Sequence, residues 1–115
     1  MPEKKIDQLS EKTQRQIQEL QSYEQIFQNL MMQKQAFQIE LNETELAISE
    51  LAKTNEDVYK LIGSIMIKAS KKETEAELKK KKELIDLRLK TIEKQEEELG
   101  SETEKLRKEI MEELK

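Results

Sequence analysis

The sequence predicts a mostly α-helical chain, in which a long antiparallel two-helix coiled coil carries one central β-hairpin. Apolar residues follow a heptad repeat from Ile6 to Leu51 and again after residue 71, as is typical of coiled coils. Between these stretches lies a short run of strand-forming residues. The stretches are nearly equal in length, so the second helix is expected to return along the first. We expect a single domain, 1–115, with a first helix over about 5–53, a hairpin over 58–69 and a second helix over about 71–114.

The composition argues against an ordinary globular core and against several kinds of chemistry. Only 35% of the 115 residues are hydrophobic and 40% are charged, which suits long helices better than a packed domain. There is no cysteine and no histidine, so thiolate chemistry is excluded and a nucleophile lacks its usual base. The formal net charge of −4 argues against nucleic acid, and no apolar run approaches membrane-spanning length. We expect a cytosolic protein that is not an enzyme and binds no cofactor, metal, nucleic acid or membrane.

In the first helix, ten of the fourteen a and d positions between Ile6 and Leu51 are apolar, which indicates a coiled-coil seam. This helix is the acidic one, because residues 1–57 carry 6 basic and 11 acidic side chains, against 13 and 14 in residues 71–115. Six apolar residues lie off the seam. They either widen the stripe that faces the partner helix or form a second contact surface near Ile26 to Met32. The six are Ile17, Ile26, Met31, Met32, Ile39 and Leu46.

The hairpin is predicted from Gly63 and Ser64, a pair that suits a two-residue turn in which the glycine takes positive φ. This turn pairs Ile62 with Ile65 and Val58 with Ala69, and it leaves both faces mostly apolar. A lone hairpin is marginal in water, and its unpaired edges invite further strands. We therefore expect a sheet or barrel assembled from several chains. The expected assembly residues are Val58, Tyr59, Leu61, Ile62, Gly63, Ile65, Met66 and Ile67.

The second helix is expected to start at a capping box formed by Ser70 and Glu73. Its d positions are all apolar. Gly100 and Ser101 are expected to interrupt it and to create a soft point, because an interior glycine weakens a helix.

Two charged runs in the second helix each allow two interpretations. The carboxylates at 96–98 and 112–113 are read as solvated, since successive helical residues diverge around the axis, with metal binding or acid and base chemistry as the alternative. The lysines at 79–82 are read as a solvated face paired with Glu75, Glu77 and Glu83, with an acidic docking surface as the alternative.

Apolar residues near the free ends of the helices also have two readings. They are either the last layers of the coiled coil or a surface that stays available to bind exposed apolar segments of other proteins. They are Ile6, Leu9, Leu106, Ile110, Met111 and Leu114.

Over essentially its whole length the chain resembles the prefoldin β-type subunits. The resemblance is carried by the segments Gln33 to Gln35, Val58 to Gly63 and Ile65 to Lys68, by Glu77 with Leu78, and by Arg88 to Glu96. It implies an ATP-independent molecular chaperone, a hetero-hexamer of α-type and further β-type subunits whose hairpins form a double β-barrel.

The resemblance also implies that coiled-coil tips bind unfolded client proteins, prevent their aggregation and transfer them to a group II chaperonin. The strands 58–62 and 65–69 would then belong to the barrel. The terminal apolar residues would be the client surface, an assignment by position only. The alternative is a structural coiled-coil protein that oligomerises or tethers without binding clients.

Overall fold

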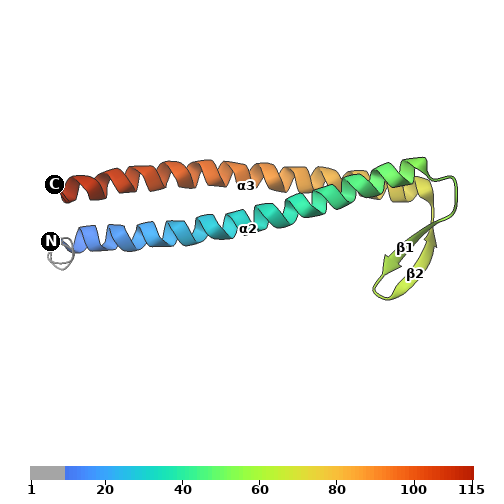
Figure 1. The fold of residues 1–115 in the computed structure, drawn as a ribbon, viewed down its shortest axis with the longest axis horizontal. Coiled ribbons are helices and arrows are strands. Elements are labelled where there is room, and N and C mark those ends of the chain that lie inside the picture. Colours follow the sequence, from blue (N-terminus) through green and yellow to red (C-terminus); the bar gives the residue numbers. More distant parts are fainter. Residues whose placement is uncertain (1–9) are drawn as a thin grey trace. The chain divides into compact units, whose positions relative to one another are not determined.

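The computed structural model describes residues 10–115, and within them the chain has two long helices joined by a β-hairpin (Figure 1). Helix α2 runs Glu11–Lys53, strand β1 Val58–Ile62, strand β2 Ile65–Ala69 and helix α3 Lys71–Glu113. Both helices have 43 residues, as their similar heptad stretches indicated. The predicted fold class is confirmed. Among residues 10–115 the two strands pair only with each other, so a barrel needs strands from other chains.

The described residues divide into two compact units, each containing a segment of both helices. The terminal unit comprises residues 10–33 and Thr91–Lys115, and the hairpin unit comprises Lys34–Lys90. Within each unit the two helical segments are antiparallel. In the hairpin unit, for example, Phe37 of α2 lies beneath Arg88 of α3, whereas Glu45, further along α2, pairs with Lys82.

Hydroxyl groups cap the starts of both helices. The Ser10 hydroxyl accepts a hydrogen bond from the Thr13 N–H at 3.2 Å, so α2 begins at Glu11, where a start near residue 5 was expected. Residues 5–9 lie outside the described residues. The Ser70 hydroxyl accepts a hydrogen bond from the Glu73 N–H at 3.3 Å, which is the serine half of the predicted capping box.

The predicted seam forms the core within each unit. All six buried hydrophobic residues of the described chain occupy predicted a or d positions, and three polar residues share the seam with them. The hydrophobic residues are Leu30, Leu51, Ile85, Ile92, Leu106 and Ile110, and the polar ones are Thr13, Gln16 and Thr44. Thr44 donates its hydroxyl proton to the Glu40 carbonyl, so this polar group is satisfied.

Gln16 is the exception among the polar seam residues. It is only 8% exposed, and its Nε2 donates to Glu109 at 3.0 Å, but its Oε1 is buried without a partner. An unpaired buried acceptor costs about 1–3 kcal/mol.

The Gln16→Leu variant is therefore expected to raise the free energy of unfolding by about 1 kcal/mol. A urea titration followed by circular dichroism measures this, with the exposed Gln18→Leu as control. A lower stability for Gln16→Leu than for the wild type would contradict the account.

Ion pairs between the helices follow the predicted division of charge. Glu24 pairs with Arg107 at 3.7 Å in the terminal unit, and Glu40 pairs with Lys81 at 3.4 Å in the hairpin unit. In these pairs, as in that of Glu45 with Lys82, α2 supplies the acid and α3 the base. Each exposed ion pair contributes little to stability. Together they favour the arrangement in which the acidic side chains of α2 face the basic side chains of α3.

The expected interruption of the second helix is wrong. α3 passes through Gly100 and Ser101 without a break. An interior glycine costs only about 1 kcal/mol relative to alanine. Half-buried Leu99 and buried Leu106 lie in the seam on either side, and this packing outweighs the local cost.

Candidate interaction surfaces

The hairpin has the predicted register. Ile62 pairs with Ile65, Leu61 with Met66, and the ladder ends where Val58 meets Ala69. Gly63 has φ +62°, and no other residue in the described chain has positive φ. Only one of the two turn positions therefore needs the left-handed region, which glycine adopts without a steric cost.

Most side chains of the hairpin are exposed, although they are apolar. Leu61 is 70% and Met66 68% exposed, and Tyr59, Ile62, Ile65 and Ile67 are also exposed. Val58 and Ala69, at the root, are partly covered. Two ion pairs hold the strands to the rest of the hairpin unit, Lys60 with Glu77 of α3 and Lys68 with Asp57. The hairpin thus presents a concentrated apolar surface with two unpaired edges, which is the property of a strand pair that other strands complete.

The lysine run at 79–82 is largely paired, but not with all the expected partners. Lys79 binds Glu75 at 3.0 Å, as expected, and this hydrogen bond and charge lower the pKa of Glu75. Lys81 instead reaches Glu40 across the helix pair. Glu77 forms its ion pair with Lys60 of the hairpin and not with a lysine of the run. The run therefore ties α3 to α2 in addition to being solvated.

The predicted tip residues fall into three groups. Ile6 and Leu9 lie outside the described residues. Leu106 and Ile110 are each only 7% exposed, as members of the seam. Met111 is 61% and Leu114 38% exposed, so only these two present an apolar surface at the described end of α3.

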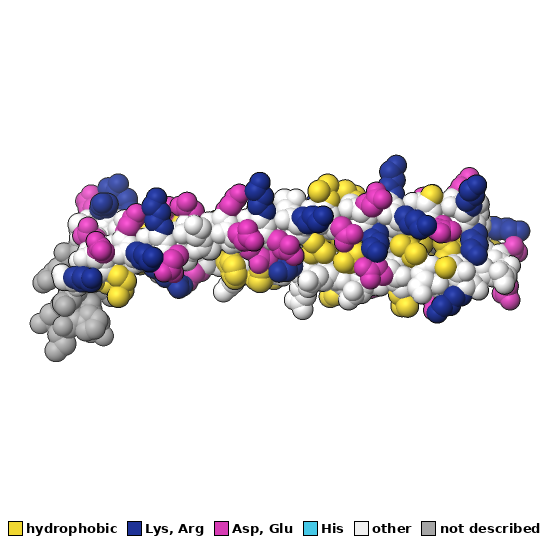
Figure 2. All heavy atoms as spheres, turned by 90° about the horizontal axis from the view of Figure 1, so that it is seen from above, with side chains coloured by type: hydrophobic (Ala, Val, Ile, Leu, Met, Phe, Trp, Pro, Cys, Tyr) yellow, Lys and Arg dark blue, Asp and Glu magenta, His cyan; other side chains and the backbone are white. Residues whose placement is uncertain are grey.

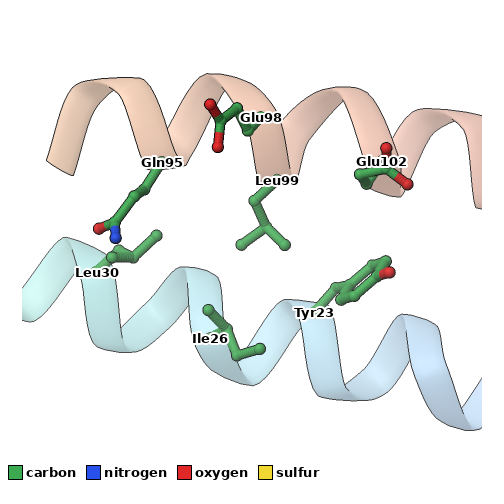
Figure 3. Close-up of a pocket in the computed structure, with 7 residues that line it drawn as sticks. All are labelled: Tyr23, Ile26, Leu30, Gln95, Glu98, Leu99 and Glu102. Atoms are coloured by element: carbon green, nitrogen blue, oxygen red, sulfur yellow. The ribbon is translucent and has the colours of Figure 1, made fainter. Parts of the chain in front are cut away.

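Sequence reasoning missed a groove between the helical segments of the terminal unit (Figure 3). Its volume is about 310 Å³, and α2 contributes one side and α3 the other. The lining residues, here called the acidic groove, are Tyr23, Ile26, Leu30, Gln95, Glu98, Leu99 and Glu102. Leu99 reaches from α3 toward the α2 side, while Glu98 and Glu102 stand along the α3 side. The second contact surface suggested near Ile26 was the nearest signal in the sequence.

The local electrostatic environment of this groove is negative. The Tyr23 hydroxyl donates to Glu19 at 2.8 Å, and this hydrogen bond is the main reason why the pKa of Tyr23 is raised. The charge of Glu102 raises it further. The Tyr23 ring lines the groove.

Within residues 10–115 no group of three or more carboxylates is placed to hold a metal ion. In the same residues, neither helix offers an apolar stretch that could cross a bilayer. Charged side chains of both signs cover the helical surface, with apolar side chains exposed between them (Figure 2).

Comparison with known proteins agrees with this arrangement. The family described as "Prefoldin subunit" matches residues 14–115. The chain is 36% identical over 99 residues to the prefoldin subunit beta of Thermococcus kodakarensis, covering 84% of this chain and 85% of the relative. It is 38% identical over 108 residues to that of Methanothrix thermoacetophila, covering 92% and 90%.

A solved structure has the same fold. The crystal structure of the prefoldin beta subunit from Thermococcus strain KS-1 superposes with a TM-score of 0.82 at 33% identity, covering 90% of this chain and 93% of that one. The matching family is one of chaperone components and not of enzymes. With its two helices, its single hairpin and these relatives, the chain belongs to the prefoldin subunit family and is of the β type.

Proposed function

We propose that this subunit works in a cytoplasmic hetero-hexamer with α-type and further β-type subunits. The complex holds unfolded proteins without ATP, prevents their aggregation and passes them to a group II chaperonin. The observation that supports this proposal best is the exposed apolar hairpin. Leu61 and Met66 leave a large apolar area in water on a sheet with two open edges. Strands from neighbouring subunits would cover the area and close the edges, so the hairpin acts as the assembly device.

Client binding is assigned to the free helix ends. Met111 and Leu114 offer exposed apolar side chains there, and methionine adapts to varied partners because its side chain is flexible and polarisable. Leu106 and Ile110 join this surface only where the helix ends separate, because both are buried when the helices are packed. One such end holds a client weakly. Several ends on one complex raise the effective concentration for each further contact, which increases avidity by about 10²–10⁴.

The test is a double substitution that removes the exposed apolar surface without disturbing the seam. Met111→Ser with Leu114→Ser, in the subunit assembled with its α-type partner, is expected to abolish most suppression of client aggregation. The hexamer and its helical content should be unchanged, because neither side chain is buried. Light scattering of a chemically unfolded client measures the effect. The matched control is Leu84→Ser with Leu87→Ser, which removes two exposed leucines from α3 within the hairpin unit.

The same experiment separates the proposal from its rival, a structural coiled-coil protein whose ends are closed. The rival predicts that Met111→Ser with Leu114→Ser leaves the activity of the complex unchanged. It also predicts that the subunit forms a complete assembly without a second kind of chain. Unchanged activity would contradict the assignment of clients to the helix ends, and complete assembly without a second kind of chain would contradict the proposed hetero-hexamer.

A further inference from the structure

Negative charge is concentrated in the terminal unit rather than in one helix. The hairpin unit carries 12 basic and 11 acidic residues, whereas the described part of the terminal unit carries 7 basic and 12 acidic residues. The imbalance is greatest around the acidic groove. The facing stretches 16–33 and 95–104 contain seven glutamates and no lysine or arginine.

Several of these carboxylates form no ion pair within the described chain, although Lys105 lies near Glu102. Glu24 is paired with Arg107, but among residues 10–115 no ion pair is formed by Glu97, Glu98 or Glu102. Glu98 and Glu102 line the acidic groove, and Glu97 lies beside them on α3. Their charges are therefore available to a partner from outside the chain.

The lining of the acidic groove between the carboxylates is apolar. Ile26 is 47% exposed, and Tyr23, Leu30 and Leu99 complete the surface. A volume of about 310 Å³ is at the small end for protein binding sites, which suits a side chain or a short segment rather than a folded domain.

We propose that the acidic groove binds segments of non-native proteins in which a large apolar side chain is flanked by lysine or arginine. The apolar side chain would cover Ile26 and Leu99, and the flanking cations would pair with Glu98 and Glu102. The inference rests on the proposed function, since it names the class of client segment that the complex selects.

The hairpin unit provides an internal comparison. It has an apolar groove on α3 lined by Leu84 and Leu87, but there the surrounding charges have both signs. They are Glu77, Lys80, Lys81 and Glu83. A groove of that kind gives no net attraction for either sign of flanking charge. Charge selection is thus expected in the terminal unit alone.

The experiment measures the binding of two labelled peptides to the assembled complex by fluorescence anisotropy. Both have the same core of leucine, phenylalanine and leucine, with two lysines on each side in one peptide and two glutamates in the other. At low salt the lysine peptide is expected to bind about fivefold more tightly, as two exposed ion pairs would provide. The preference should shrink at about 1 M salt, where the Debye length falls to about 3 Å.

Matched variants locate the effect. Glu98→Gln with Glu102→Gln should remove the preference, whereas Glu43→Gln with Glu50→Gln, an equal change in net charge on exposed residues of the hairpin unit, should leave it intact. Ile26→Ser should weaken both peptides several-fold, and Ile39→Ser, at a comparably exposed isoleucine, should not.

The outcomes distinguish this inference from the proposed function. Equal binding of both peptides, or a preference that survives Glu98→Gln with Glu102→Gln, would overturn charge selection at the acidic groove even if the complex still suppresses aggregation. Failure of the intact wild-type complex to suppress aggregation would instead overturn the proposed function. A preference lost only in the groove variants supports the inference.

Discussion

Replacing Met66 with glutamate is expected to prevent this subunit from assembling while its own helices stay folded. Met66 is 68% exposed and faces Leu61, which is 70% exposed, so a carboxylate costs little in the single chain. In an assembled sheet the same carboxylate would be buried without a partner, a penalty of several kcal/mol. Each 1.4 kcal/mol is a factor of ten, so association should weaken by at least about a hundredfold. The mass of the mixture with α-type subunits, from light scattering after size exclusion, measures this loss.

The chain offers a closely matched control for this prediction. Met32→Glu changes the same residue type, adds the same charge and acts at the same exposure of 68%, but on helix α2. Its complex should form with normal mass, and circular dichroism should give equal helical content for both variants. Normal assembly of the Met66→Glu subunit would contradict the assembly role of the hairpin. Equal loss of assembly in both variants would show that added charge alone is responsible.

The elements of this fold that depend on local chemistry were predictable from the sequence. Gly63 with Ser64 fixes the turn, and the alternation of side chains then fixes every pair from Ile62 and Ile65 to Val58 and Ala69. The residues that are buried lie at a and d positions of the heptad, because the period determines the face that meets the partner helix, but Phe27, also a predicted a position, is 40% exposed. Ser70 marked the start of α3 through its hydroxyl.

What the sequence could not provide depends on distances between segments far apart in the chain. The break expected at Gly100 failed because a local cost was not weighed against packing on either side. The off-seam residues Met31 and Ile26 have similar heptad positions, yet Met31 is half-buried and Ile26 is exposed. Coverage of such positions depends on the side chains that the opposite helix places there, and the heptad pattern does not give this information.

The acidic groove was missed for a related reason. Counting charges by helix assigns the acidic excess to the first half of the chain. Five of the seven glutamates lie within 95–104 and are visible in the sequence, but the structure also shows that the stretch facing them, 16–33, contains no lysine or arginine. A scan for paired antiparallel stretches that lack lysine and arginine could have found it. At the free ends the heptad does separate these residues, since buried Leu106 and Ile110 hold d and a positions and exposed Met111 holds neither.

The most direct test of the central claim is client aggregation in the absence of nucleotide. A chemically unfolded protein is diluted into the wild-type subunit assembled with its α-type partner, and light scattering is followed over time. Scattering is expected to fall as complex is added. It should reach nearly the buffer level once the molar concentration of helix ends exceeds that of the unfolded client, and ATP should make no difference. Met66→Glu subunits mixed at equal concentration should lose this effect, because single ends lack multivalent binding. Undiminished scattering in the presence of an intact complex would contradict the chaperone function and leave a structural role.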